Sequence, residues 1–110
     1  MKEKLNILLV CGSGASSSFM AAKMRYAARD RGIDINIKAR SESEVMNYVG
    51  DVDAVMVGPH LSMYFEDIKK RYEGEFVTIL MQKDYYANLD GAKALDHLLS
   101  EIEHNTEKEN

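Results

Sequence analysis

Residues 5–18 read LNILLVCGSGASSS, a nearly continuous apolar run that leads into a loop of small residues. Such a run is typical of a strand buried on both faces, as in the centre of a parallel sheet. The loop begins with Cys11, the one cysteine of the chain, and continues with glycine and serine. The stretch therefore predicts the first strand of an α/β domain, followed by a loop and a helix.

Three further apolar runs alternate with helical patterns. Residues 54–57 and 76–81 are mostly apolar, whereas residues 33–38 alternate strictly, which predicts an edge strand with one wet face. The periodic apolar positions of the helices are Met20, Met24, Ala27 and Ala28, then Leu61, Phe65, Ile68 and Tyr72, and finally Leu95, Leu98, Leu99 and Ile102. We expect a single doubly wound α/β domain, with a four-stranded parallel sheet in the order 2-1-3-4 and helices on both faces.

Local signals indicate the ends of the helices and of the domain. Asp90 is expected to cap the last helix, and Ser41 and Glu44 have the spacing of a capping box for a short helix over residues 41–48. Residues 105–110 contain no apolar side chain and are predicted to form a disordered tail. Residues 1–104 are therefore expected to form the domain.

Composition limits the possible classes of function. The chain has 110 residues and a net charge of −4, and its 14 basic side chains form no dominant patch, which disfavours nucleic acid as a partner. A single cysteine excludes an internal disulfide and a paired-cysteine metal site, and we expect neither a metal nor a cofactor. No apolar run approaches the roughly 20 residues of a membrane span, and the start does not resemble a secretory signal. We therefore expect a soluble cytoplasmic protein without direct membrane insertion.

The predicted strand order brings Cys11 to a ligand site. In that order the chain changes direction between strands one and three, and ligands bind at such a point, outside the carboxyl ends of the strands. The loop at 11–18 and the turn Gly58-Pro59-His60 flank this crevice. A lone cysteine is also compatible with an inert buried thiol, but the strand-end position and the Gly/Ser loop favour a functional one.

The loop that starts at Cys11 has the composition of an anion site. Its glycines let the backbone turn tightly with N–H groups facing inward, and a helix N-terminus attracts negative charge. The expected phosphate-binding residues are Gly12, Ser13, Gly14, Ala15, Ser16, Ser17 and Ser18. The helix dipole also lowers the pKa of a nearby thiol, by about one unit. Cys11 is thus predicted to be a nucleophile beside a phosphate cradle.

Other loop chemistries fit less well. The loop lacks the third glycine of a dinucleotide-binding fingerprint, and the chain lacks the Gly-Lys-Ser/Thr of a Walker A loop. Residues 11–18 hold no arginine of the kind with which cysteine phosphatases grip phosphoryl oxygens. A low-molecular-weight cysteine phosphatase and a non-catalytic flavodoxin-like binding domain are the two alternative functions.

Three motifs in order along the chain resemble one family. The pattern CxxGxSSS at 11–18, after a first strand, resembles the enzyme IIB component of the bacterial sugar phosphotransferase system, of the lactose/cellobiose/chitobiose type. Gly-Pro at 58–59 and YANLDG at 86–91 are similar to later motifs of that family. Two positions depart from the family pattern: Ala87 stands where glycine is frequent, and His60 where many relatives are expected to have glutamine.

The resemblance implies a reaction and two protein partners. Cys11 would accept a phosphoryl group from a phosphohistidine of enzyme IIA. It would then pass the group to a sugar, such as cellobiose, chitobiose or lactose, held by the membrane enzyme IIC. Sugar selection would lie in that membrane partner.

Several further side chains lie near the predicted crevice. The possible crevice or partner contacts are Gly58, Pro59, His60, Tyr85 and Tyr86. His60 is either a contact to phosphate or to a partner, or a solvated loop histidine. Met20 and Met63, early in their helices, are either core residues or parts of a docking surface. His97 is predicted to lie at the surface.

The thiol of Cys11 is expected to be partly ionised near neutral pH, because it faces a helix N-terminus. Its rate of alkylation by iodoacetamide, followed against pH, should have a midpoint below the ~8.5 of a free cysteine. N-acetylcysteine in the same buffers is the control. A midpoint at or above that of the control would mean that the thiol is buried or poorly aligned with the helix dipole.

Overall fold

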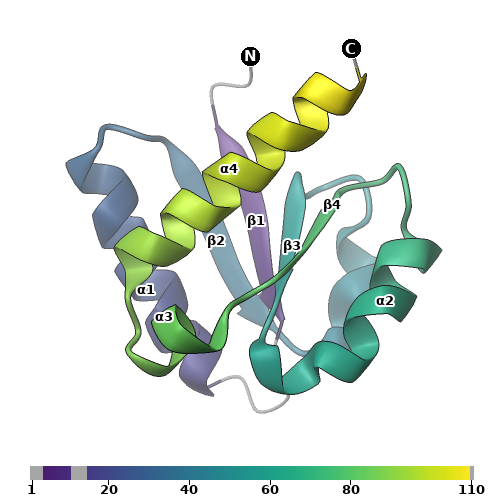
Figure 1. Cartoon of the computed structure of the whole chain (residues 1–110), viewed down its shortest axis with the longest axis horizontal. Coiled ribbons are helices and arrows are strands. Elements are labelled where there is room, and N and C mark those ends of the chain that lie inside the picture. Colours follow the sequence, from purple (N-terminus) through teal and green to yellow (C-terminus); the bar gives the residue numbers. More distant parts are fainter. Residues whose placement is uncertain (1–3, 11–14, 110) are drawn as a thin grey trace.

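The structure of the chain, a computed structural model, describes residues 4–10 and 15–109, with side chains for 4–10 and 18–104. Four parallel strands form one sheet in the order β2-β1-β3-β4, which confirms the predicted topology (Figure 1). The strands are β1 (Leu5–Val10), β2 (Ile35–Arg40), β3 (Ala54–Val57) and β4 (Val77–Leu80). The α-helices are α1 (Ala15–Asp30), α2 (Ser62–Arg71), α3 (Lys83–Ala87) and α4 (Gly91–Glu109), and two 3-10 helices, η1 (Glu42–Tyr48) and η2 (Pro59–Leu61), precede β3 and α2.

The bounds of β2 differ from the prediction. The strand begins two residues later than expected, because Ile33 donates its N–H to the carbonyl of Ala28 at 2.9 Å, within the turn that closes α1. Pairing with β1 then runs from Leu5 opposite Ile35 to Val10 opposite Arg40. The strand is at the edge of the sheet, as predicted.

Helices cover both faces of the sheet, as predicted, and each face has its own core. On one face, β1 packs with α1 and α4 through residues that include Ile7, Leu9, Met20, Met24, Leu95 and Leu98, all buried. On the other face, β1 and β3 pack with η1 and α2 through Leu8, Val10, Val45, Val55, Val57, Leu61 and Ile68. The two central strands are therefore buried on both sides, which is why their sequence is continuously apolar.

The local helix signals were confirmed in one case and wrong in another. Asp90 caps α4, because its Oδ1 accepts the N–H of Lys93 at 3.1 Å. Ser41 forms no cap bond to the backbone; its hydroxyl instead donates to Glu44 Oε2 at 3.4 Å, so the predicted capping box does not form. The helix that follows is a 3-10 helix.

The last helix is longer than the sequence indicates. The backbone of α4 continues to Glu109, whereas the sequence predicts a disordered tail after residue 104. Helix propagation adds one backbone hydrogen bond for each residue and does not itself need an apolar side chain. The division of the chain at residue 104 stays a prediction.

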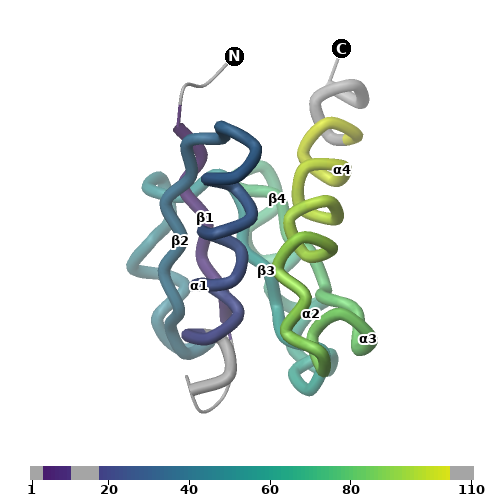
Figure 2. The backbone as a smooth tube through the Cα atoms, turned by 90° about the vertical axis from the view of Figure 1, so that its left-hand side faces the viewer, coloured from purple at the N-terminus to yellow at the C-terminus, as the bar shows by residue number. Residues whose placement is uncertain are grey.

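The loops at the carboxyl ends of the strands gather at one end of the molecule. The first turns of α1 and α2 lie at this end together with α3, whereas β1 begins and α4 ends at the opposite end (Figures 1 and 2). All groups that the sequence predicts to be functional follow carboxyl ends of strands. The fold therefore brings those among the described residues to the same end.

Gly91 is expected to be required for the contact between α4 and α1. A Cβ at this buried position would lie 2.3 Å from the backbone carbon of Lys23 and 2.4 Å from its carbonyl oxygen. Gly91→Ala should lower the free energy of unfolding by roughly 1–3 kcal/mol, although alanine favours helix more than glycine does. Urea denaturation measures this change.

The exposed Lys93 on the same turn offers a matched control. Lys93→Ala should change the free energy of unfolding by no more than about 0.5 kcal/mol. A Gly91→Ala protein as stable as the parent would contradict the close contact between the helices.

Candidate functional site

The central strands end side by side, and one hydrogen bond extends their pairing past the strands. Val10 lies opposite Val57 at the last register position, and the N–H of Gly58 donates to the carbonyl of Val10 at 2.9 Å. The predicted nucleophile Cys11 lies outside the described residues, as do Gly12, Ser13 and Gly14. Cys11 is nevertheless bonded to Val10, whose carbonyl accepts this bond. The chain therefore enters the cysteine loop from the point where β1 meets the turn after β3.

The cysteine loop leads directly into the N-terminus of α1. Residues 15–18, the part of the predicted cradle that the structure describes, form the first turn of this helix. The helix has 16 residues, and no acidic side chain lies in its first turn. The N–H groups of that turn and the positive end of the helix dipole therefore meet no negative side chain of the same turn.

The turn after β3 folds His60 back over Gly58. Pro59 starts the short helix η2, and the N–H of Leu61 donates to the carbonyl of Gly58 at 2.9 Å. A Cβ on Gly58 would lie 2.8 Å from His60 Cε1, 3.2 Å from its Nδ1 and 3.4 Å from the Val10 carbonyl oxygen. The imidazole and the Val10 carbonyl thus both lie close to the position that a Cβ of residue 58 would occupy. Glycine leaves this position empty.

The two tyrosines after β4 lie in different surroundings. Tyr86 contacts His60, with ring centroids 5.9 Å apart and the rings tilted by 44°. Tyr85 is 3% exposed and belongs to the core, so the structure does not support the expectation that it lines the crevice mouth. The structure therefore brings Tyr86, but not Tyr85, to the turn after β3.

His97 contacts the hydroxyl of the buried Tyr85, a contact that the sequence does not indicate. The Tyr85 hydroxyl and His97 Nδ1 are 2.6 Å apart, so the predicted surface histidine is instead packed against α3. Burial raises the pKa of Tyr85 to about 12, so the phenol keeps its proton in this contact. The other ring nitrogen of His97, Nε2, lies 3.9 Å from Glu101 Oε2. Tyr85 and His97 are twelve positions apart, in different helices, and no pattern in the sequence indicates that they pair.

A left-handed residue closes α3 and sets the positions of the tyrosines. Leu89 has φ 52°, its N–H donates to the Tyr86 carbonyl at 3.2 Å, and the N–H of Asp90 donates to the Tyr85 carbonyl at 2.9 Å. Glycine usually occupies this conformation. Here Leu89 packs against the core, which offsets the backbone strain. Ala87 is in α3 and has no positive φ, so its departure from the family pattern costs nothing there.

Exposed apolar side chains flank the same end of the molecule. Met63, in the first turn of α2, is 72% exposed, whereas Met20 is fully buried and belongs to the core. Phe19, near the start of α1, is 64% exposed and was not predicted. It lies one position before Met20 and so falls outside the periodic apolar face of the helix. A large apolar residue outside that face is the sequence signal that could have identified Phe19 as exposed.

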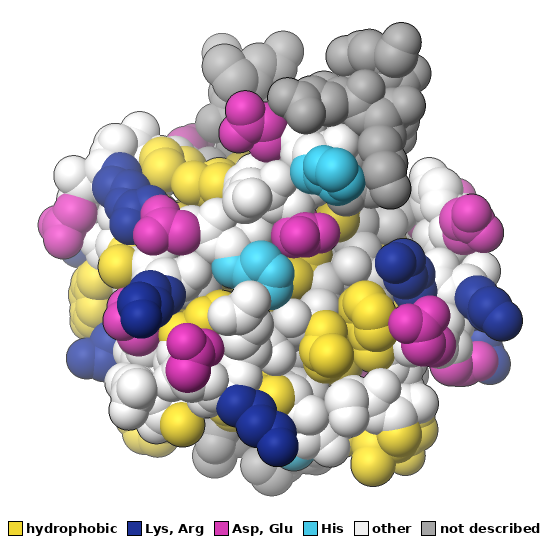
Figure 3. Space-filling model, in the orientation of Figure 1, with side chains coloured by type: hydrophobic (Ala, Val, Ile, Leu, Met, Phe, Trp, Pro, Cys, Tyr) yellow, Lys and Arg dark blue, Asp and Glu magenta, His cyan; other side chains and the backbone are white. Residues whose placement is uncertain are grey.

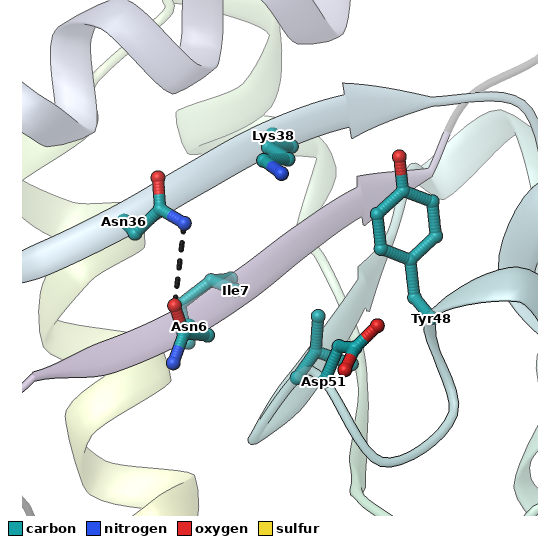
Figure 4. Close-up of a pocket in the computed structure, with 7 residues that line it drawn as sticks. Asn6, Ile7, Asn36, Lys38, Tyr48 and Asp51 are labelled. Carbon is teal, nitrogen blue, oxygen red and sulfur yellow. Dashed lines mark hydrogen bonds between the residues drawn. The ribbon is translucent and has the colours of Figure 1, made fainter.

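A polar hollow lies away from the carboxyl ends of the strands. It has a volume of about 230 Å³, and Asn6, Asn36 and Lys38 of the strands face Tyr48 and Asp51 across it (Figure 4). Asn36 donates to Asn6 Oδ1 at 3.2 Å, near the amino ends of β1 and β2. The nearby Asp53 accepts the N–H of Asn6 at 2.8 Å and so joins β1 to the start of β3. Both acidic residues therefore lie towards the amino end of β3, away from the strand end at Val10 that leads into the cysteine loop.

The surface that carries α4 has no large patch of one charge. Basic and acidic side chains are interspersed on it (Figure 3). No helix among the described residues has the length and apolar character of a membrane span.

The comparison with family sequences covers most of the chain. A model of the family described as "PTS system, Lactose/Cellobiose specific IIB subunit" matches residues 6–97. The oligo-beta-mannoside-specific EIIB component of Bacillus subtilis is 30% identical over 95 residues, which are 86% of this chain and 92% of that protein. The lactose-specific EIICB component of Lacticaseibacillus casei is 22% identical over 92% of this chain, which spans 18% of that longer protein.

A solved structure has the same fold. The lactose-specific IIB component domain of Streptococcus pneumoniae superposes with a TM-score of 0.79 at 18% identity. The match covers 89% of this chain and 97% of that domain. The strand order and the helical layers described above are therefore shared with a known domain.

Replacing Tyr85 is expected to change how stability depends on pH. An unfolded tyrosine loses its proton near pH 10, whereas the folded Tyr85 keeps it to about pH 12. The folded state thus binds the proton more tightly, and the free energy of unfolding should fall as the pH rises from about 10 towards about 12. Tyr85→Phe has no such proton, so its stability should fall less steeply across that range in urea denaturation.

Tyr26 is an exposed tyrosine and offers a matched control. Tyr26→Phe should follow the parent across the same range. Parallel curves for the parent and Tyr85→Phe would contradict the pKa assigned to the buried phenol.

Proposed function

Because the chain belongs to the family of lactose/cellobiose-specific IIB subunits of the phosphotransferase system, we propose that it carries a phosphoryl group on Cys11 during sugar uptake. Members of this family are phosphotransferases. The donor would be a phosphohistidine of enzyme IIA, and the acceptor a sugar held by the membrane enzyme IIC. The protein would act at the cytoplasmic side of that transporter.

The position of Val10 is the observation that supports Cys11 as the carrier. Val10 is fully buried at the end of the central strand, and its carbonyl bonds to Gly58. Strand β1 ends at Val10, and Cys11 follows it in the sequence, next to the change of chain direction where α/β domains bind ligands. We expect a thiol that directly follows this residue to be anchored by the strand and to be within reach of a partner.

The first step would transfer the group from nitrogen to sulfur. The thiolate of Cys11 attacks the phosphorus of the phosphohistidine, the P–N bond breaks, and its electron pair stays on the imidazole nitrogen of the donor. A new S–P bond holds the phosphoryl group. The helix N-terminus favours the thiolate before this step and the charged phosphoryl group after it.

The second step would transfer the group from sulfur to oxygen. A sugar hydroxyl attacks the phosphorus while its proton passes to a base of the sugar-binding partner. The S–P bond breaks, and its electron pair returns to Cys11 as thiolate. The Lacticaseibacillus casei relative carries IIC and IIB in one protein by its name, which supports a direct encounter between the two. A β-linked disaccharide such as cellobiose, chitobiose or lactose is the proposed acceptor.

The proposed cradle consists of backbone N–H groups from residues 12–18. Such groups bind the phosphoryl oxygens without a metal, and the first turn of α1 adds no acidic side chain that would repel them. Residues 11–18 hold no arginine, and arginines can raise phosphoryl-transfer rates roughly 10³–10⁵-fold. The phosphocysteine should therefore persist until the sugar arrives.

Incubation with phosphoenolpyruvate, the general phosphocarriers and enzyme IIA should add one phosphoryl group to the chain. Intact-mass analysis measures the addition, and iodine should remove it because the S–P linkage is iodine-sensitive. Cys11→Ser should abolish this iodine-sensitive group, since the hydroxyl is a far weaker nucleophile than a thiolate.

Two histidine variants complete this experiment. His60 is the histidine next to the strand ends, and His104 lies exposed on α4. Both His60→Ala and His104→Ala should still take up the group. A parent protein that carries the phosphoryl group on His60 would rule out Cys11 as the carrier.

A further inference from the structure

The charge of the chain is divided unevenly between two parts of the fold. Residues 1–40, which include β1, α1 and β2, carry eight basic and three acidic side chains, a net charge of +5. Residues 41–110 carry six basic and fifteen acidic side chains, a net charge of −9. In Figure 1 α1 and β2 lie beside each other on the left of the molecule, and Figure 2 looks onto that side. The fold therefore gives an acidic protein one basic side.

Helix α1 presents two aromatic side chains to solvent on that side. Phe19 is 64% exposed and Tyr26 is 58% exposed, and neither belongs to a core. They are seven positions apart, about two helical turns, so they lie on one line along the helix. The buried residues of α1 lie on its opposite face and are Met20, Ala21, Met24 and Ala28. The aromatic pair is therefore available to a partner.

Two basic side chains flank this aromatic pair. Lys23 lies about one turn after Phe19, and Arg29 lies three positions after Tyr26. Both are exposed, and neither side chain forms a hydrogen bond or an ion pair with a described residue. The outward face of α1 thus combines aromatic rings with cations that the protein itself does not neutralise.

The other charged groups of this side are partly engaged within the protein. Arg25 donates to the Ile37 carbonyl of β2 at 2.9 Å, and Arg31 donates to Asp96 of α4 at 2.6 Å. The acidic side chains of residues 15–40 are Asp30 and Asp34. Lys23 and Arg29 are therefore the cations of α1 on which a partner with negative charge would act most directly.

We propose that the outward face of α1 binds the surface of an anionic lipid bilayer. Anionic headgroups attract lysine and arginine, and aromatic side chains are favoured at the depth of the headgroups. Neither the polar hollow described above nor a second hollow between η1 and α2 includes a residue of α1. The headgroup layer adapts to such a convex helix face, whereas an extended peptide is held by a groove or a sheet edge.

The charge of the remaining chain sets the orientation on the bilayer. An anionic surface repels the net charge of −9 on residues 41–110, so this part of the chain faces away from it. Helix α1 then lies along the bilayer, and its first turn is at the end of the molecule where the carboxyl ends of the strands lie (Figure 2). Binding of this kind is peripheral and does not depend on the proposed function.

Sedimentation with vesicles tests the proposal. The parent protein should sediment with vesicles of phosphatidylcholine and phosphatidylglycerol in a ratio of about two to one, and far less with phosphatidylcholine alone. Binding should decrease as the salt concentration rises from about 50 to about 300 mM, because salt screens the attraction. A parent protein that does not bind the anionic vesicles at the lower salt concentration overturns the proposal, also where a poly-glutamate column retains it, because the face then fits an acidic protein.

Two double variants separate this face from the net charge. Lys23→Gln combined with Arg29→Gln should weaken binding to the anionic vesicles roughly ten- to thirtyfold. Lys69→Gln combined with Lys70→Gln removes the same charge from exposed positions of α2 and should change binding no more than about twofold. Equal losses in the two double variants would overturn the proposal.

A tryptophan reporter identifies the residues that meet the lipid, because the chain contains no tryptophan of its own. The emission of Tyr26→Trp should shift to the blue when anionic vesicles are added, and brominated phosphatidylcholine in the vesicles should quench it. Met63→Trp, at a 72% exposed position of α2 on the other side of the molecule, should show neither effect (Figure 1). Unchanged emission of Tyr26→Trp in a sample that sediments with the vesicles would mean that another face binds, and would overturn the proposal.

Discussion

The pairing of β1 with β3 is the constraint on which the other elements depend. At the amino end, Asn6 exchanges hydrogen bonds with Asp53: the Asp53 N–H donates to the Asn6 carbonyl at 2.7 Å, and the Asn6 N–H to the Asp53 carboxylate at 2.8 Å. At the carboxyl end, Gly58 donates to Val10. The pair is thus joined beyond both ends of β3, and its buried residues require cover on both faces. The helices on the two faces follow from that requirement, and β2 and β4 pair with the outer edges of β1 and β3.

The same pairing aligns the strand ends and so collects loops that are distant in the sequence. The turn after β3 meets the residue before Cys11, and the turn after β4 brings Tyr86 to His60. Small residues allow these close approaches: Gly58 leaves space for the His60 ring, and Gly91 lets α4 begin against the backbone of α1. A strained Leu89, held by its packing in the core, ends α3 between them. Packing around the core therefore positions groups at the candidate site.

The family match and the geometry give different kinds of information about the chain. The match assigns the chain to the IIB subunits of sugar phosphotransferase systems, and the geometry describes which side chains surround the strand ends. His60 illustrates the difference. Its ring lies between Gly58, in the turn after β3, and Tyr86, in the helix after β4, so its placement is a property of this chain.

The amino-acid sequence by itself determined the strand order, the two buried central strands and the cap at Asp90, because these depend on apolar periodicity and on short-range hydrogen bonds. It also predicted Cys11 and its loop as the candidate site, since a strand followed by glycine and serine is a local pattern, and this assignment stays a prediction. The tertiary structure alone decided that Tyr85 is buried on His97, that Tyr86 instead reaches His60, and that Met20 is core while Met63 is exposed. Each of these depends on how far a neighbouring helix approaches, and residues distant in the sequence set that distance through their packing.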